Sequence, residues 1–540
     1  MLVFRDGGRR VALRPLLEQL VTSCRRARAG DDHEAWLAGL LRAGELECGL
    51  ADAESAEAAR VARVTDALAD ALLGSPFDAS VLTRLESLSP ESLPNAAMLS
   101  VPEGFAYYAL HPLDYSDAVA ALPQPARVVV VGIRSIGTTL SAAARAAFTR
   151  RGVSAERITV RPTGHPWDRE TRLSPEQERL IAGAGRNAHF VVVDEGPGLS
   201  GSSFLSVAEA LAAAGVPRER ITLLGSCASQ SVDASRMRAR DAAARWARFR
   251  YVSVAPPSRL PRECGVELSG GEWRRHFLPG DAEWLASWTA FERRKFLARD
   301  GGRIFKFEGL GHYGEAVRER SRALAQMGFS PAVADAGDGF AAYQFVTGIP
   351  LRAADANEEV LRRIAAYCAA RAKHLRVPAA ETAALTQLIT VNWREAFGEE
   401  VTAPALAVER PVIADARVQP HEWVRAADGT IWKADAASHG DDHFFPGPTD
   451  IAWDLAGAII EWELDAESAA FLLSEYRRRS RDDAEARLPG YLLAYALFRL
   501  GYCEMAADAM RGSPEEPRLR RDAARYRRYA QGLRENSVAA

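Results

Sequence analysis

The segment FVVVDEGPGLSGSSF, residues 190–204, constrains the fold of this chain more than any other stretch. Four apolar residues run directly into two carboxylates, Asp194 and Glu195, and a loop of mostly Gly, Pro and Ser follows. A short apolar run bounded by such a loop is typical of a buried strand. The small-residue loop can bind an anion through backbone N–H groups, and the two acids can bind a diol or Mg²⁺. The segment therefore suits a site for a phosphorylated ribose, while a purely structural strand-to-helix turn or a different kind of nucleotide site would show a similar pattern.

The region around this segment, residues 96–255, alternates strand and helix patterns. The strand patterns cover residues 127–132, 157–164, 189–196 and 220–227. Short strand–helix–strand units form right-handed crossovers and a parallel sheet, so we predict an α/β domain with a Rossmann-like parallel sheet. Ligands of such sheets bind beyond the carboxyl ends of the strands. The loops at 132–139 and 196–203, which are the richest in Gly, Ser and Thr, lie at those ends.

The rest of the chain divides into three regions. Apolar residues spaced three and four apart predict helices over 8–75, and we assign 1–95 to a helical N-terminal region. Residues 256–300 are assigned to a connector. Residues 301–540 begin with strand patterns and continue as helices, which predicts an α+β domain. A chain of 540 residues is long enough for several such domains.

Composition excludes several classes of partner. The net charge of −3, from 68 basic and 71 acidic residues, does not suggest nucleic-acid binding, so we expect small-molecule partners. Six widely spaced cysteines with no CxxC pair argue against a zinc site or a disulfide framework. The start of the sequence has no signal-peptide pattern, and no apolar run reaches transmembrane length. We therefore expect a cytoplasmic protein without membrane contact, and the sequence leaves oligomerisation open.

Residues 190–204 resemble the phosphoribosyl-pyrophosphate (PRPP) motif of class I phosphoribosyltransferases: four apolar residues, two acids, a short spacer and a Thr/Ser-Gly run. The resemblance implies that Asp194 and Glu195 hold the ribose hydroxyls and Mg²⁺, and that the following loop binds the 5-phosphate. The loop residues are Ser200, Gly201, Ser202 and Ser203. The loop is one residue longer than usual. Gly198 stands where some members have a general base, so that role has no candidate here.

A second stretch, residues 128–140, resembles the pyrophosphate loop of the same family. The residues implied in binding pyrophosphate are Gly132, Arg134, Ser135, Gly137 and Thr138. The Arg134 guanidinium and Mg²⁺ would neutralise the leaving pyrophosphate. Arg161, His165 and Arg169 follow the next strand, where the family has a mobile catalytic loop, although an ordinary surface loop explains these three residues equally well.

The C-terminal half resembles the aminoglycoside-phosphotransferase-like kinases over residues 428–459. In those kinases a strand ends in a metal-binding Asp, and a pattern like GDPAYDLA opens the next helix. By this match Asp435 would hold Mg²⁺, and Asp450 and Asp454 would be structural.

The lysine-bearing strand of such kinases also has a counterpart. Residues 303–311 look like that strand, with Lys306 placed to bind the nucleotide phosphates. The resemblance implies that Glu315 or Glu319, on the following helix, pairs with this lysine.

The catalytic loop of those kinases, HGDxxxxN, has no complete counterpart. The corresponding stretch is ADARVQPHEWV, in which Asp415 is the candidate base and Pro420 stands in place of the Asn. His421 and Glu422 are candidates to replace the missing groups. His439, Asp441, Asp442 and His443 form another dense run of metal-capable side chains, for which a solvated loop is the better interpretation.

Our leading hypothesis is therefore a bifunctional enzyme. The middle domain would transfer phosphoribose from PRPP to an unidentified acceptor with Mg²⁺, and the kinase-like domain would use ATP and Mg²⁺ if it is active. Two alternatives stay open. One is a regulatory protein that senses PRPP or nucleotides and has an inactive kinase-like module. The other is a nucleotide hydrolase or phosphorylase that uses the same ribose-phosphate site.

Overall fold

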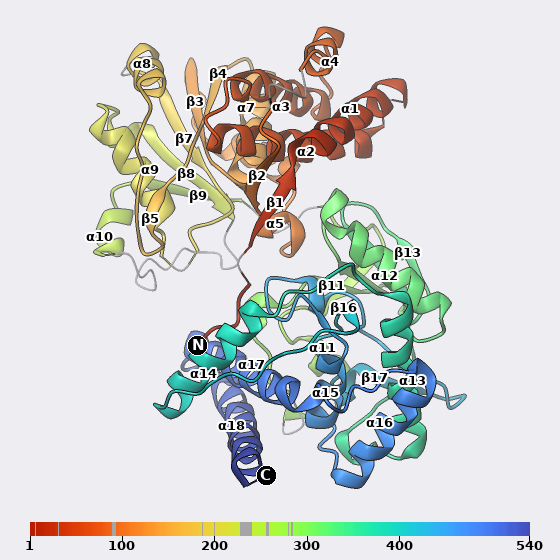
Figure 1. Cartoon of the computed structure of the whole chain (residues 1–540). Helices are drawn as coiled ribbons and strands as arrows, with labels where there is room; N and C mark the ends of the chain where they lie inside the picture. Colours follow the sequence, from red (N-terminus) through yellow and green to blue (C-terminus); the bar gives the residue numbers. More distant parts are fainter. Residues whose placement is uncertain are drawn as a thin grey trace. The chain divides into compact units, whose positions relative to one another are not determined.

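The structure is a computed structural model, and it shows a mixed α/β protein with two compact units (Figure 1). It describes all residues except 6, 31, 89–92, 186, 199, 227–239, 255–258, 279, 282–283 and 540, and the side chains of 535–539. The parallel-sheet unit comprises Gly7–Leu260 and Leu310–Tyr313. The antiparallel-sheet unit comprises Met1–Asp6, Pro261–Gly309 and Gly314–Ala540.

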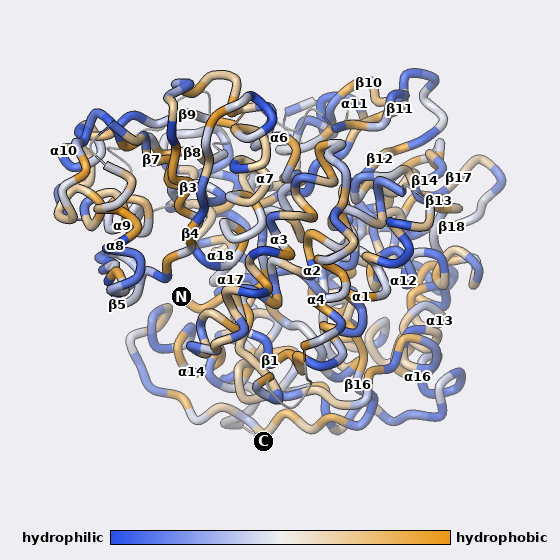
Figure 2. Tube along the Cα trace, turned by 90° about the horizontal axis from the view of Figure 1, so that it is seen from above, coloured by the Kyte–Doolittle hydropathy of each residue, from blue (hydrophilic) through white to orange (hydrophobic). Residues whose placement is uncertain are grey.

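The parallel-sheet unit contains a five-stranded sheet in the order β4-β3-β7-β8-β9, and every neighbouring pair is parallel. The strands are β3 (Arg127–Ile133), β4 (Ser154–Val160), β7 (His189–Val193), β8 (Ile221–Ser226) and β9 (Arg250–Val254). The prediction of a parallel sheet is confirmed. Strand β7 is buried along its whole length, as expected for a strand that is covered on both faces, and β3 is a hydrophobic stretch in Figure 2.

Helices cover this sheet on both faces. They are α6 (Pro112–Ala118), α7 (Ile136–Arg150), α8 (Pro175–Ala184), α9 (Ser202–Ala213) and α10 (Ala242–Trp246). Alternate residues of β3, such as Val129 and Val131, share one core with Phe204 and Leu205 of α9. Helix α7 contacts β3, β4 and β7. From β3 the chain passes through α7 to β4, which pairs with one edge of β3. The later strand β7 pairs with the other edge, so the strand order reverses between β3 and β7. Such a switch point is where open α/β sheets bind ligands.

The N-terminal region is not wholly helical. Its elements are β1 (Gly8–Ala12), α1 (Leu13–Gly30), α2 (His33–Asp52), α3 (Ala58–Leu72), α4 (Ala79–Glu86), β2 (Ala96–Ser100) and α5 (Glu103–Ala106). The helix predicted from residue 8 is wrong over 8–12, because β1 pairs with the distant β2, which local periodicity does not reveal. Helices α2 and α3 pack on α7, so this region belongs to the parallel-sheet unit.

The antiparallel-sheet unit begins with a sheet in the order β10-β11-β12-β14-β13. The strands are β10 (Cys264–Glu267), β11 (Lys295–Ala298), β12 (Arg303–Phe307), β13 (Val333–Asp335) and β14 (Phe340–Gln344), with helices α11 (Trp273–Phe277) and α12 (Glu315–Gln326). Residues 256–300, assigned to a connector, thus supply two strands of this sheet. β11 pairs with β12 across a short turn that contains Gly301, and this pairing places the predicted boundary at 301 inside a hairpin.

The remainder of this unit is mainly helical, with two small sheets. The helices are α13 (Glu358–His374), α14 (Ala383–Phe397), α15 (Ala452–Glu461), α16 (Ala466–Ser480), α17 (Leu488–Ala509) and α18 (Glu515–Ala539). The strands are β15 (Gly348–Pro350), β16 (Pro411–Ile413), β17 (Trp423–Ala426), β18 (Ile431–Lys433) and β19 (Pro448–Asp450). Helix α17 contacts α14, α15 and α18 and lies at the centre of the core. Among the helices that the structure describes, we find none with the length and apolar character needed to span a bilayer.

The first residues of the chain complete the core of the antiparallel-sheet unit. Val3 is fully buried there, and the N-terminus lies beside α14 (Figure 1). The Asn392 amide nitrogen of α14 donates to the Leu2 carbonyl at 2.9 Å. The Phe445 N–H donates to the Val3 carbonyl at 3.1 Å, and the Arg5 N–H donates to the His443 carbonyl at 2.8 Å. This unit is therefore built from both ends of the sequence, with the parallel-sheet unit inserted between them.

We predict that Val3→Ala destabilises the antiparallel-sheet unit, whereas Val266→Ala does not. Val3 is fully buried and Val266 is 46% exposed, so the same change removes buried methyl groups only at residue 3. The expected loss at Val3 is about 1–3 kcal/mol in the free energy of unfolding, measured by urea denaturation. Equal midpoints for the two variants would contradict the docking of the N-terminal residues.

Candidate functional site

The antiparallel-sheet unit brings together two charged residues that are far apart in the sequence. Lys306 lies on β12, and Asp435 follows the end of β18 by two residues. The Lys306 Nζ donates to Asp435 Oδ1 at 2.8 Å and to the Ser438 hydroxyl at 2.7 Å. The lysine is buried. Because a buried ammonium needs charged or polar partners, this contact determines how the strand and the loop meet.

The surroundings of Asp435 favour its ionised form. Burial opposes ionisation, but the ammonium of Lys306, with His439, Lys295 and Lys433, holds the pKa of Asp435 well below its usual range. His439 Nε2 lies 3.4 Å from the second carboxylate oxygen. An ionised carboxylate is the form that binds Mg²⁺, so Asp435 fits the metal-binding role that the sequence implied.

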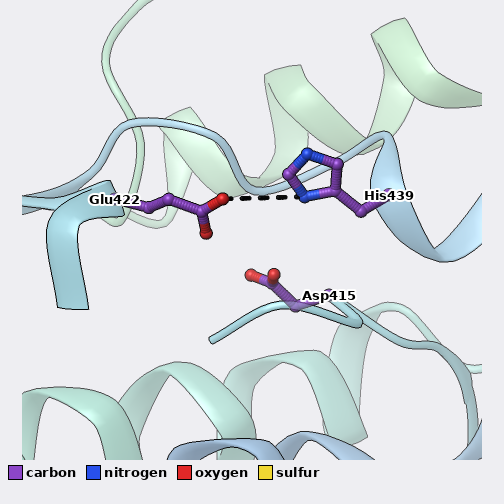
Figure 3. Close-up of side chains that lie close together, drawn as sticks. All are labelled: Asp415, Glu422 and His439. Atoms are coloured by element: carbon purple, nitrogen blue, oxygen red, sulfur yellow. Dashed lines mark ion pairs between the residues drawn. The ribbon is translucent and has the colours of Figure 1, made fainter. Parts of the chain in front are cut away.

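A second cluster lies beside this pair, around Lys433. Its Nζ donates to Glu422 Oε2 at 2.7 Å, lies 3.3 Å from Asp415 Oδ2 and also donates to the Asp435 carbonyl. Figure 3 shows the side chains of Asp415, Glu422 and His439 turned toward one another, and their nearest oxygen and nitrogen atoms all lie within 4.8 Å. Burial raises the pKa of Glu422 to about 7, although Lys433 opposes the rise.

Two buried carboxylates hold the loops that carry these residues. Asp454, on α15, accepts hydrogen bonds from the backbone N–H groups of Asp415 at 3.0 Å and Ala416 at 3.1 Å. Asp450 accepts from the N–H groups of Glu409 at 2.8 Å and Arg410 at 2.7 Å. Both acids are buried and accept hydrogen bonds from backbone N–H groups, which fits a structural role.

Other predicted residues do not join the site. Glu319 is exposed on α12, and the second carboxylate near Lys306 is Glu308, at 3.4 Å. The predicted pairing of Lys306 with Glu315 or Glu319 is therefore wrong, since Glu315 is exposed as well. Glu308 directly follows β12, two residues after Lys306, and the period of two of an extended chain turns both side chains to the same side. That period of two is the sequence signal that would have identified it.

The run from His439 to His443 does not converge on one metal. Asp441 pairs with Arg320 at 3.0 Å, and Asp442 accepts from the Phe444 N–H at 2.8 Å. His443 stacks on Phe4. His421 also has a packing role, since its ring stacks on Trp273. Only His439 of the run faces the cluster of Asp415 and Glu422, because the short helical turn at His439–Asp441 directs successive side chains apart.

In the parallel-sheet unit, Asp194 and Glu195 follow β7 directly at the switch point. Glu195 Oε2 accepts from the Gly104 N–H at 2.9 Å, and the Tyr115 hydroxyl donates to the carbonyls of both acids at 2.9 Å. Burial raises the pKa of Asp194 to about 7 and that of Glu195 to about 8. The carboxyl pair is thus held with little charge compensation, which favours protons or a bound cation.

The two predicted anion loops lie on either side of this switch point. A Cβ on Gly137, in the first turn of α7, would come within 2.6 Å of the Val193 carbonyl, so only glycine permits the start of this helix to approach β7 this closely. Gly132 is similarly confined by Ser141 and Gly137. Ser135, at the start of α7, has a φ of 110°, a strained conformation for a residue with a side chain. Thr138 is buried in the first turn of α7.

The loop before α9 has its hydroxyls engaged. Ser200 and Ser202 are hydrogen-bonded to each other at 2.9 Å, and Ser202 also donates to the Pro166 carbonyl at 2.7 Å. Gly201 is left-handed, with a φ of 65°, and Ser203 lies in the first turn of α9. The loop therefore has the backbone turn that an anion site needs, while Ser200 and Ser202 would have to exchange partners to bind a phosphate.

The predicted basic residues lie in two places. Arg134 and Arg161 share a carboxylate partner, Asp52, which the sequence did not indicate. Asp52, the last residue of α2, accepts from Arg134 Nη1 at 3.1 Å and from Arg161 Nε at 3.1 Å. His165 and Arg169 lie instead on the hairpin β5 (Thr163–His165) and β6 (Asp168–Glu170). Arg161 thus contacts the loop after β3 through the Arg134 carbonyl, whereas His165 and Arg169 lie on the hairpin that follows β4, and their assignment to a catalytic loop stays a prediction. Nothing in the sequence around Asp52 distinguishes it from other acids on helices.

No protein-family model matches the chain, and no curated protein matches it. Solved structures with some similarity include choline kinase LicA from Streptococcus pneumoniae, at 15% identity and a TM-score of 0.32, over 45% of this chain and 89% of that chain. A choline/ethanolamine kinase family protein from Mesorhizobium loti has 16% identity and a TM-score of 0.32, over 44% and 84% of the two chains. A mutant of aminoglycoside phosphotransferase APH(4)-Ia has 13% identity and a TM-score of 0.30, over 46% and 92%. These scores are too low to establish a shared fold, so functional conclusions depend on the geometry of the two sites.

We predict that Asp194→Asn with Glu195→Gln removes a loss of stability that the native protein shows as pH rises. The pKa values of both acids are raised in the fold, so the folded state retains protons that the unfolded chain releases. Stability should therefore fall between about pH 4 and about pH 8, and the amides should abolish this contribution. The measurement is the melting temperature at about pH 5 and about pH 8 in the absence of divalent ions.

The matched control is Glu170→Gln, an exposed acid of the same unit. It should leave the pH dependence unchanged. A double amide variant whose melting temperatures change with pH as in the native protein would show that the two acids titrate normally.

Proposed function

We propose that the antiparallel-sheet unit is a nucleotide-dependent phosphotransferase. The observation that supports this most strongly is the meeting of Lys306 and Asp435 at 2.8 Å, next to the loop that carries Asp415. Phosphoryl transfer requires little covalent chemistry from the protein. It requires a cation on the phosphates, a carboxylate for Mg²⁺ and a group near the acceptor hydroxyl, and this site offers one residue for each task.

Each residue would have its own role in phosphoryl transfer. The Lys306 ammonium would leave Asp435 and bind the nucleotide phosphates instead, because they carry more negative charge. Asp435 would then be free to hold Mg²⁺, which neutralises the phosphate oxygens when bound. Asp415 would orient the acceptor hydroxyl and accept its proton. The Tyr367 hydroxyl, which donates to Asp415, and the two N–H groups that Asp454 binds would hold that carboxylate and its loop in place.

We predict that Lys306→Ala and Asp435→Asn weaken ATP binding in different ways. Asp435→Asn should reduce the affinity for ATP only when Mg²⁺ is present, because it removes a metal ligand. Lys306→Ala should reduce it with or without Mg²⁺, because it removes a phosphate contact. Each loss is on the order of ten- to a hundredfold, measured by isothermal titration calorimetry.

Lys373→Ala provides the control, since Lys373 is exposed on α13 and should leave ATP affinity unchanged. The phosphotransferase proposal fails if the native protein does not bind ATP at millimolar concentration with Mg²⁺. It fails equally if the Lys306 and Asp435 variants bind as tightly as the native protein.

The parallel-sheet unit supports a second proposal, PRPP-dependent phosphoribosyl transfer. The observation that favours it is the pair of Asp194 and Glu195 at the switch point. Beside this pair, the end of β3 and the start of α7 pack so closely that Gly132 and Gly137 have no room for a side chain. A sensor of PRPP or nucleotides, or a nucleotide hydrolase or phosphorylase, would use the same acids and loops. The contact of Asp52 with Arg134 and Arg161 adds a condition, because pyrophosphate must compete with this carboxylate.

We predict that Asp52→Ala tightens the binding of pyrophosphate to the protein. Removing an exchangeable carboxylate from Arg134 and Arg161 should raise the affinity about two- to fivefold, and adding Arg134→Ala should reverse the gain. Calorimetry with pyrophosphate and Mg²⁺ measures the effect. Asp70→Ala is the matched control, because Asp70 pairs with Arg145 at 2.7 Å outside the predicted pyrophosphate loop. Weaker binding after Asp52→Ala would overturn the pyrophosphate assignment of this loop.

A further inference from the structure

We propose that Lys433 is a built-in cation of the phosphotransferase site, which therefore binds its nucleotide with a single divalent ion. This inference rests on the proposed function of the antiparallel-sheet unit. It assigns to Lys433 a positioning role, because the ammonium acts on the substrate through Asp415 and Asp435.

The contacts of Lys433 are those of a bound cation rather than of a surface lysine. Its side chain is fully buried on β18, between the strand partner β17 and the loop of Asp415. Its Nζ has three oxygen neighbours, from the Glu422 carboxylate, the Asp415 carboxylate and the Asp435 carbonyl. An ammonium has three donors; two of them form hydrogen bonds to Glu422 and the Asp435 carbonyl, and Asp415 adds an ion pair.

The groups around Lys433 have the chemistry of a metal site. Asp415, Glu422 and His439 offer two carboxylates and an imidazole whose ligand atoms all lie within 4.8 Å of one another. Such donors can hold a divalent ion. Lys433 already places a positive charge 2.7 Å from one carboxylate and 3.3 Å from another. A divalent ion bound by Asp415, Glu422 and His439 would be repelled by the Lys433 ammonium. This repulsion is strong because the site is buried and water screens it little.

The two lysines of the site differ in what they can exchange. Lys306 binds the side chains of Asp435 and Ser438, both of which can take new partners when phosphates arrive. Lys433 contacts two acids and a backbone carbonyl inside the fold, and if it left them the buried carboxylates of Asp415 and Glu422 would lose their nearest cation. Lys433 therefore stays in place when Lys306 moves, and Asp435 remains as the carboxylate for one Mg²⁺.

The sequence around Asp415 also fits a site with a single divalent ion. The stretch that carries Asp415 has Pro420 at the position where the resembling kinases have an Asn. Proline has no side-chain amide, so it supplies no oxygen to a metal. The chain thus lacks a side-chain ligand at that position and has a buried ammonium among the remaining acids.

The test counts Mn²⁺ ions bound per chain in the presence of ATP, by electron paramagnetic resonance of free Mn²⁺ during titration with MnCl₂. The full chain is used with Asp194→Asn and Glu195→Gln, so that the parallel-sheet unit does not contribute ions. We expect one nucleotide-dependent Mn²⁺ with Lys433 present. Lys433→Met removes the charge while keeping the length, and should admit a second Mn²⁺. Lys433→Arg keeps the charge and should not.

A further variant identifies the position of the second ion. Adding Glu422→Gln to Lys433→Met should abolish the second Mn²⁺, and it also restores the balance of buried charge if Lys433→Met alone does not fold. Two nucleotide-dependent ions with Lys433 present, or one ion in a folded Lys433→Met protein, overturn this inference but not the phosphotransferase proposal. Absence of any nucleotide-dependent Mn²⁺ in the protein that retains Lys433 overturns both.

Discussion

Charge compensation in the buried interior of the antiparallel-sheet unit is the constraint on which the rest of that unit depends. Lys306, Asp435, Lys433 and Asp415 are separated by up to 129 residues, yet their charges meet within 2.8 to 3.3 Å. A buried charge left without a partner costs several kcal/mol, so β12, β18 and the loop of Asp415 are stable only when assembled together. The same arrangement leaves one exchangeable lysine and one ionised carboxylate next to a second acid. The proposed site for phosphates and a metal ion would thus use the same charges that neutralise the interior of this unit.

The parallel-sheet unit is governed by a different constraint, the close approach of α7 to β7 at the switch point. Gly137 permits the first turn of α7 to contact the end of β7, and the next residues, Asp194 and Glu195, have raised pKa values. A cation that binds this pair must displace protons, so its affinity should rise with pH. Helix α2 adds a contact from outside the sheet, since Asp52 binds Arg134 and Arg161. The surroundings of the predicted pyrophosphate loop therefore include the N-terminal helices as well as the sheet.

The structure also explains which predictions from the sequence were wrong. Strand β1 was not predicted because its partner β2 lies more than eighty residues away. A run of five residues is also too short for its periodicity to indicate a strand. β10 and β11 were assigned to a connector for the same reason, because antiparallel pairing with β12 depends on contacts that no local pattern encodes. The resemblance to kinases implied Glu315 or Glu319 as the partner of Lys306, whereas the carboxylate near it is Glu308, which directly follows β12.

The sequence alone determined the parallel sheet, because strongly apolar β-branched runs that alternate with helical patterns have few other ways to be buried. Through the resemblance to aminoglycoside-phosphotransferase-like kinases it also indicated Lys306, Asp435 and Asp454 as candidate residues, and their tasks stay predictions. Only the tertiary structure decided which charges face one another: Lys433 with Asp415 and Glu422, Asp52 with two arginines, and Val3 within a core formed by the other end of the chain. Ion pairs and core contacts between distant residues leave no periodic trace, because their energy depends on distance in space rather than on spacing along the chain.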